Sequence, residues 1–279
     1  MQNPLDNEGI LCYTNNVVIL LERGESMPKF FVIADVHGFY DEMIDALNKA
    51  GFDKDNENHW LISLGDETDR GPKNKDVINY LNKLERAVFV RGNHSTLFEN
   101  CCLRGYPQSH DFGNGTFDCI DELSGHKAKN FNIAADIAWH FMQPFMKKQV
   151  DYFETKNYIF VHAWIPVNIK DGLPKYYTRS RNFEYNPDWR IAHALDWEDC
   201  KWMNPFETAS QGLNQTGKII VHGHWHNSAY WAKINHTPEF SKDTCFDICE
   251  HDNCIGVDAC TAYTHKCNVL VLEDEFLED

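Results

Sequence analysis

The sequence predicts an α/β fold built on a largely parallel sheet of buried strands. Two observations support this: short, nearly continuous apolar runs rich in Val, Ile and Phe, and segments of helical period between the first three of them. Runs of this kind are typical of strands covered on both faces. They are FFVIA (30–34), WLISL (60–64), AVFV (87–90), YIFV (158–161), KIIV (218–221) and NVLVL (268–272).

Two amphipathic helices are predicted between the first three strands. The first covers 39–51 and ends at Gly51, a residue suited to a helix C-cap. The second covers 71–85 and has Pro72 near its start. Their apolar faces are formed by Met43, Ile44 and Leu47, and by Val77, Ile78, Leu81 and Leu84. This order of strand, helix, strand, helix and strand predicts that one half of the fold is a βαβαβ unit built on a largely parallel sheet.

The remaining segments are less regular, and we expect one domain over residues 1–279. Residues 95–157 predict a mostly helical insertion that forms a cap over the site. The stretch 165–210 is rich in Pro, Asp, Trp and Tyr, which favours loops with a short helix near 191–195. The run Val17–Leu21 predicts an edge strand, since it is far too short to span a bilayer.

Composition narrows the class of protein. The formal net charge of −16 disfavours binding to a nucleic-acid duplex, which requires clustered cations. With no basic leader ahead of a long apolar core, we expect a cytoplasmic protein without membrane association. The ten cysteines match no compact disulfide framework, and a reducing compartment fits them better. A second zinc site among the cysteines of 245–267 is the alternative to plain reduced thiols.

Polar side chains follow directly after most of the predicted strands. In open α/β sheets, ligands gather at the carboxyl ends of the strands. Repulsion among so many carboxylates and acceptors is offset by a cation, so the pattern predicts one or, better, two metal ions. The residues are Asp35 and His37, Asp66 and Asp69, Asn93 and His94, His162, and His224 with His226.

Each of these residues alone has an ordinary explanation. His37 could be a loop histidine, Asn93 a turn residue beside Gly92, and Asp69 with Arg70 a surface ion pair. Their occurrence together, at successive strand ends, is what favours a site.

In chain order the blocks DVHG, GDETDRG, RGNH, VHA and GHWH resemble the signature blocks of the calcineurin-like metallophosphoesterase superfamily. They are most similar to its phosphoprotein phosphatase branch, including the small phage-type and bacterial serine/threonine phosphatases and the related diadenosine tetraphosphate hydrolases. The DFGNGT stretch (111–116) and the tail from Cys254 also resemble these enzymes. The resemblance implies a β-sandwich flanked by helices, in αββα layers.

The resemblance also implies a role for each residue. Asp35 and His37 would bind a first metal ion, Asp66 would bridge both ions, and Asn93, His162 and His224 would bind the second. A hydroxide shared by the two ions would attack phosphorus. His94 would protonate the leaving group with the support of Asp69, and Arg70 would bind the phosphoryl oxygens.

Two assignments stay open. His226 is either an additional ligand of the first metal or a residue outside the coordination sphere. The second phosphate-binding arginine is not identified by the block ALDWEDCKW, which contains none; Arg190, Arg179 and Arg181 are the upstream candidates.

We therefore expect a dimetal phosphoesterase that acts on phosphomonoesters, with phosphoserine or phosphothreonine in proteins, or a small phosphoester, as substrate. Oxygen and imidazole ligands without thiolate favour manganese, with iron or zinc as alternatives. One alternative is a dinucleoside polyphosphate hydrolase with an aromatic base-binding pocket in the insertion. A non-catalytic metal-binding scaffold is the alternative from another class.

Overall fold

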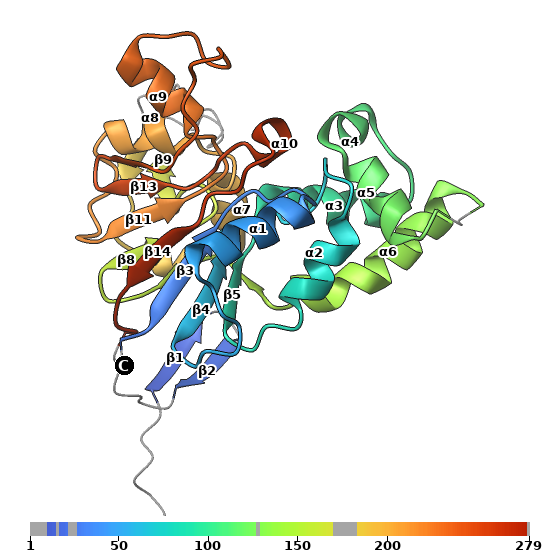
Figure 1. The fold of residues 1–279 in the computed structure, drawn as a ribbon, viewed down its shortest axis with the longest axis horizontal. Helices are drawn as coiled ribbons and strands as arrows, with labels where there is room; N and C mark the ends of the chain where they lie inside the picture. Colours follow the sequence, from blue (N-terminus) through green and yellow to red (C-terminus); the bar gives the residue numbers. More distant parts are fainter. Residues whose placement is uncertain (1–9, 15–16, 22–26, 127–128, 170–182, 278–279) are drawn as a thin grey trace, which may run out of the picture.

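The computed structural model describes residues 10–14, 17–21, 27–126, 129–169 and 183–277. Two five-stranded sheets face each other, and helices cover the outer face of each, so the layers run αββα (Figure 1). This confirms the predicted fold class.

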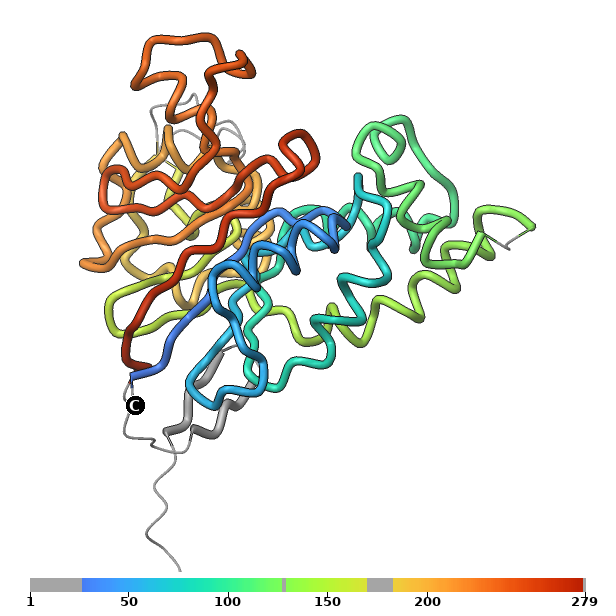
Figure 2. The backbone as a smooth tube through the Cα atoms, in the orientation of Figure 1, coloured from blue at the N-terminus to red at the C-terminus, as the bar shows by residue number. Residues whose placement is uncertain are grey.

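The first sheet has the order β14-β3-β4-β5-β6, and all its pairs are parallel except β14 with β3. The last strand therefore lies beside the first strand of the sheet, red beside blue in Figure 2. The strands are β3 (Lys29–Ile33), β4 (His59–Ser63), β5 (Ala87–Val90), β6 (Gln149–Val150) and β14 (Leu270–Glu273).

The predicted βαβαβ half is confirmed. Helix α1 (Tyr40–Ala50) connects β3 to β4 and ends at Gly51, whose φ of 82° is the left-handed cap conformation. Helix α2 (Asn74–Leu81) connects β4 to β5 and is shorter than expected, because the chain leaves the helix before Leu84.

Residues 95–157 are mostly helical, as predicted. The helices are α3 (Asn93–Arg104), α4 (Ser109–Asn114), α5 (Thr116–Leu123) and α6 (Phe131–Met146). Side chains such as Phe98, Ile120 and Phe145 join α1 and α2 in one apolar core against the outer face of the first sheet. The end of the segment returns to the sheets as β6 and β7 (Phe153–Glu154).

The second sheet has the order β12-β13-β11-β8-β7, with parallel pairs at its centre. Its remaining strands are β8 (Tyr158–Phe160), β11 (Ile219–His222), β12 (Cys249–His251) and β13 (Cys254–Gly256). Between the sheets, Phe30, Val32 and Ile62 pack against Phe160 and Val221. The two sheets thus share one interior, and their strand ends meet at a common edge.

The outer face of the second sheet is covered by the segment 183–235 and its neighbours. Trp164, Trp189, Trp197 and Met203 form the core there. The expected short helix near 191–195 is replaced by a 3₁₀ turn (Trp189–Ile191) followed by α7 (Ala194–Cys200). The further elements are β9 (Val167–Ile169), β10 (Phe183–Tyr185), α8 (Pro205–Ser210), α9 (Ser228–Asn235) and α10 (Thr261–Thr264).

The run Val17–Leu21 forms a strand, β2, but it is not an edge strand of either main sheet. Within the described segments its partner is β1 (Ile10–Thr14), in a two-stranded antiparallel sheet. Among the helices of the described segments, none has the length and apolarity needed to cross a membrane.

Candidate metal centre

The predicted site residues converge at the carboxyl ends of β3, β4, β5, β8 and β11, and nearly all are buried. Two groups of potential ligand atoms each lie within 4.8 Å of one another: His37, Asp66 and His94, and Asp66, His162 and His224. Asp66 belongs to both groups, which agrees with the bridging role that the family resemblance implies for it.

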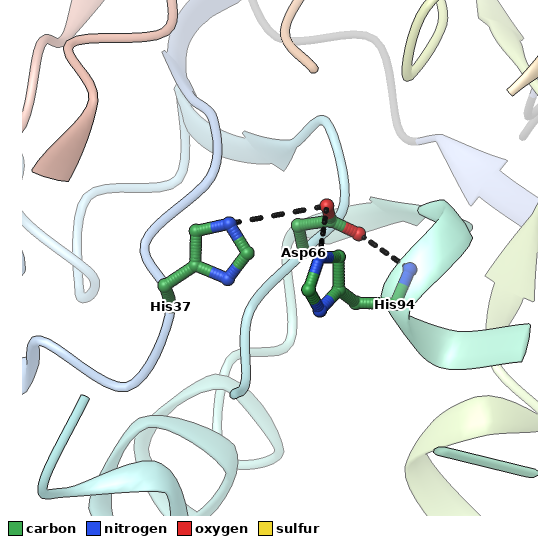
Figure 3. A group of neighbouring side chains, drawn as sticks. All are labelled: His37, Asp66 and His94. Carbon is green, nitrogen blue, oxygen red and sulfur yellow. Dashed lines mark hydrogen bonds and ion pairs between the residues drawn. The ribbon is translucent and has the colours of Figure 1, made fainter. Parts of the chain in front are cut away.

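Asp66 faces three imidazoles at once. Figure 3 shows its carboxylate between His37 and His94. Its Oδ2 atom lies 4.0 Å from Nε2 of His37, 3.9 Å from Nε2 of His94 and 3.5 Å from Nε2 of His162. Burial raises the pKa of the Asp66 carboxyl group, but positive charge among the surrounding imidazoles, at His162 first, lowers it below its usual value, and a cation held between neutral imidazoles would act in the same direction. Asp66 is therefore the anionic centre of the site.

The ring orientations of His37 and His162 are fixed by backbone carbonyls. Nδ1 of His37 donates to the Thr68 carbonyl at 2.9 Å, and Nδ1 of His162 donates to the Leu64 carbonyl at 2.8 Å. In each neutral ring the other nitrogen, Nε2, then carries a lone pair. Burial lowers the pKa of both histidines, which favours this neutral form.

The donor set fits a cation. The lone pair of His162 Nε2 lies 2.7 Å from Oδ1 of Asn93 and 3.5 Å from Oδ2 of Asp66, so three acceptor atoms converge. Buried acceptors repel one another unless a proton or a metal ion lies between them. The structure thus supports Asn93, His162 and Asp66 as ligands of one ion, with His224, whose ring centroid is 4.9 Å from that of His162.

Asp35 is in neither group of ligand atoms, but its carboxylate is buried and contacts the backbone of His224. Its Oδ2 accepts from the backbone N–H of His224 at 2.9 Å, which joins the β3 and β11 ends. Burial, followed by the negative charges of Asp258 and Asp66, raises the pKa of Asp35 well above its usual value. A divalent cation would relieve this repulsion, as expected for the ligand role assigned to Asp35 with His37.

His94 and Asp69 form the predicted pair. Nδ1 of His94 donates to Oδ2 of Asp69 at 2.7 Å, and both residues are buried. Burial alone would lower the pKa of His94, but the charges of Asp66 and Asp69 and the bond to Asp69 raise it. His94 is also close enough to Asp66 to fall within the first group of potential ligands.

Arg70 is exposed and points into the same space. Its Nη1 lies 2.9 Å from Nε2 of His37, and its Nη2 lies 3.1 Å from Nε2 of His94. The guanidinium is therefore within reach of any phosphoryl group that contacts these histidines, as the sequence predicts.

The backbone at the site is strained. Positive φ angles, which non-glycine residues rarely adopt, occur at Asp35, His37, Asp66, Asp69, Arg70 and His224. Such strain persists only where the surrounding structure enforces it, and it is typical of functional sites. Gly92 contributes by its small size, because a methyl group there would lie 2.6 Å from the Asp66 backbone nitrogen.

The structure does not bring His226 or Arg190 into either group. His226 is in neither group of ligand atoms, and its Nδ1 contacts Glu239 at 2.9 Å and Ser228 at 3.1 Å. Arg190 donates twice to Glu154, from Nε at 2.8 Å and from Nη2 at 2.6 Å, at the edge strand β7. Its guanidinium is thus already engaged by a carboxylate. Arg179 and Arg181 lie outside the described residues.

Two buried acids were not singled out from the sequence. Asp258 follows β13, and its charge acts on Asp35; burial raises the pKa of Asp258 to about 6. Glu67 accepts from Ser63 at 2.7 Å and from Gln149 at 3.2 Å, and burial raises its pKa to about 7. The signal for Asp258 was its place two residues after a strand, but that three-residue strand was too short to recognise.

The family model of the calcineurin-like phosphoesterases matches residues 28–228. That match covers well over half of the chain, so the chain belongs to the calcineurin-like phosphoesterase family. The resemblance stated from the sequence blocks is thereby confirmed.

Curated relatives align with parts of the chain. The asymmetrical bis(5'-nucleosyl)-tetraphosphatase PrpE of Bacillus subtilis is 29% identical over 163 residues, which cover 54% of this chain and 63% of the relative. PrpE of Bacillus velezensis is 42% identical over 72 residues, 23% of this chain and 29% of the relative. The chain thus spans less than two thirds of these relatives.

Solved structures share the fold. The cold-active protein-tyrosine phosphatase of a psychrophilic Shewanella superimposes with a TM-score of 0.54 and 16% identity, over 89% of this chain and 76% of that chain. A protein serine/threonine phosphatase from Saccharomyces cerevisiae superimposes with a TM-score of 0.52 and 13% identity, over 91% of this chain and 82% of that chain. At these identities the likeness concerns the fold alone.

Proposed function

We propose that this protein is a dimetal phosphoesterase. The observation that carries the proposal is the sharing of Asp66 between two groups of potential metal ligands, each within 4.8 Å. Two bound divalent cations would supply a hydroxide nucleophile at neutral pH and neutralise charge on the phosphoryl oxygens. Asp35 and His37 on one side, and Asn93, His162 and His224 on the other, would hold these cations.

The remaining residues act on the substrate. The exposed Arg70 binds the phosphoryl oxygens and orients them, since its guanidinium can donate two parallel hydrogen bonds. His94 donates the proton of Nε2 to the leaving oxygen. Asp69 holds the opposite nitrogen of the ring at 2.7 Å and favours the charged imidazolium.

Metal removal tests the proposal. Protein stripped by a chelator should lose hydrolysis of an aryl phosphate, and added manganese should restore it, because the ligands are oxygen and imidazole without thiolate. Among the cysteines of the described segments, none belongs to either group of ligands. Iron and zinc salts, added to the same stripped protein, would identify the preferred ion. Activity indifferent to chelation would contradict the mechanism.

The first candidate substrate is a phosphomonoester, with phosphoserine or phosphothreonine in a protein as the leading form. The negative charge of the chain, −16 in total, should slow encounter with acidic phosphopeptides. Neutral or basic phosphopeptides should therefore be hydrolysed faster than acidic ones.

The second candidate substrate is a dinucleoside polyphosphate. Two observations favour it: the Bacillus relatives are named bis(5'-nucleosyl)-tetraphosphatases, and the exposed indole of Trp202 has its ring 6.3 Å from that of His224. An exposed aromatic beside a metal ligand can stack on a base. It lies outside residues 95–157, where the sequence placed such a pocket.

A side-by-side turnover comparison separates the two candidates. Phosphopeptides, mononucleotides and diadenosine tetraphosphate would be offered at equal concentration to the manganese-loaded protein. Faster cleavage of the dinucleotide than of every phosphopeptide, reduced in Trp202→Ala, would establish the second candidate.

A further inference from the structure

The turn that carries Asp69 and Arg70 has a strained backbone, and Asp69 within it is buried. Both residues have positive φ angles, 76° and 63°, and the side chain of Asp69 is fully buried. Such backbone conformations are unfavourable and persist only where the surrounding structure enforces them. Some part of the fold must therefore hold this turn in place.

The start of helix α5 lies directly against the turn. At Gly115, a methyl group would lie 2.8 Å from Cα of Arg70, so only glycine permits this approach. The next residue, Thr116, is fully buried, and its hydroxyl donates to Oδ2 of Asp69 at 2.6 Å. One turn later, Cys119 is buried near Asp69; burial, followed by the negative charge of Asp69, raises the pKa of its thiol.

The carboxylate of Asp69 is oriented by these contacts. Oδ2 accepts from both Nδ1 of His94, at 2.7 Å, and Oγ1 of Thr116, at 2.6 Å. Among the described residues, Oδ1 has no hydrogen-bond partner. The Thr116 hydroxyl is therefore a contact from the helical insertion that keeps Oδ2 turned toward His94, beside the Cys119 thiol, which also bonds the Asp69 side chain.

The hydroxyl of Thr116 does not cap its own helix, α5. The N-cap of α5 is Gly115, which makes no side-chain cap, and the recorded bond of Thr116 crosses to a residue 47 positions earlier. Hydrogen bonds to a charged group are about twice as strong as neutral ones, so this bond acts on the carboxylate more than on α5.

We propose that Thr116 is a positioning residue for proton transfer, which holds the Asp69 carboxylate so that His94 presents its other nitrogen to the leaving group. The proposal rests on the proposed function, since it assigns the acid role to His94. It gives the start of α5 in the helical insertion a catalytic purpose beyond covering the sheet.

Three variants test the proposal. Thr116→Val keeps the shape and removes the hydroxyl, Thr116→Ser keeps the hydroxyl, and Thr208→Val is the matched control. Thr208 is also fully buried and donates to the Asn204 carbonyl at 2.7 Å within α8, so it loses a comparable bond outside the site. Thr116→Ala replaces the valine variant if that one does not fold.

The measurements are metal content, thermal stability, and kcat and KM on an alkyl and an aryl phosphate, with the manganese-loaded full chain. An alkyl oxide needs protonation as it leaves, whereas a nitrophenolate hardly does. We expect Thr116→Val to lower kcat about tenfold or more on the alkyl phosphate, as for loss of a bond to a charged group, and far less on the aryl phosphate. Metal content and KM should stay at wild-type values.

Thr116→Ser should restore kcat on the alkyl phosphate, and Thr208→Val should lower stability without selectivity between the substrates. Equal losses on both substrates, or no rescue by serine, would overturn the proposal. The variant Asp69→Asn distinguishes a failure of the Thr116 proposal from a failure of the proposed function. If Asp69→Asn is selective for the alkyl phosphate and Thr116→Val is not, only Thr116 is misassigned; if neither is selective, the acid role of the Asp69 and His94 pair fails as well.

Discussion

Gly92→Ala should displace the bridging carboxylate without straining the backbone. Gly92 has φ −85° and ψ 169°, a conformation open to any residue, so any effect must come from the added methyl group. That group would overlap Oδ1 of the Asp66 carboxylate most closely, and it would lie 2.6 Å from the backbone nitrogen of Asp66 and 2.9 Å from its Cγ. Ordinary contact begins at 3.4 Å, so the backbone nitrogen of Asp66 must move by roughly 0.8 Å (3.4 − 2.6) and its carboxylate oxygen by more.

The expected effect of Gly92→Ala is large on activity and moderate on stability. Overpacking of this kind lowers the free energy of unfolding by about 1 to 3 kcal/mol. A misplacement near 1 Å in a catalytic site lowers the rate about 100-fold. Metal content per chain, measured by elemental analysis after gel filtration, should fall together with kcat on an aryl phosphate.

Gly51→Ala is the matched control, because it strains the backbone without creating a steric clash. Gly51 has φ 82°, which strains an alanine by about 1 kcal/mol, but no atom lies within 4 Å of the added methyl group. This variant should lose stability and keep full metal content and kcat. If Gly92→Ala instead binds metal and turns over like the wild type, Asp66 is not held against Gly92 as described.

Three further outcomes are expected. Asp66→Asn should reduce metal content and kcat, whereas Asp69→Asn should keep the metal and lose about 10²- to 10⁴-fold in kcat on an alkyl phosphate; metal loss in Asp69→Asn would contradict the division of roles. Arg190→Ala should lower the melting temperature and leave KM unchanged, because Arg190 is paired with Glu154; a raised KM would restore it as a phosphate ligand. Burial lowers the pKa of His222 to about 3 and of His251 to about 4, so the unfolded chain takes up protons below pH 6.5 that the folded chain does not. Stability should therefore fall between pH 6.5 and pH 4, by about 2 kcal/mol per histidine at pH 5, and denaturant unfolding of His251→Phe should show a smaller fall.

The parts of the fold that the sequence predicted correctly are those with strong local signals. The runs at β3, β4 and β5 are long enough to bury both faces, and α1 and α2 carry a clear apolar stripe and, for α1, a glycine cap. Strands such as β6 and β7 consist of two residues each, which is too few to show a period. Their place in the sheets is decided by neighbouring strands rather than by their own residues.

The candidate site likewise contains residues that the sequence could predict and residues that it could not. The proposed metal ligands could be predicted to lie together because parallel strands align their carboxyl ends, so a residue's place after a strand also predicts its place in space. Thr116 carries no such information: its position depends on how Cys119, Ile120 and Leu123 pack α5 into the core below the first sheet. A hydroxyl at the start of a short helix predicts nothing until that packing sets the helix against the Asp69 turn. Residues that support catalysis through another side chain are therefore expected to be recognised from tertiary contacts, and residues that bind the metal from strand order.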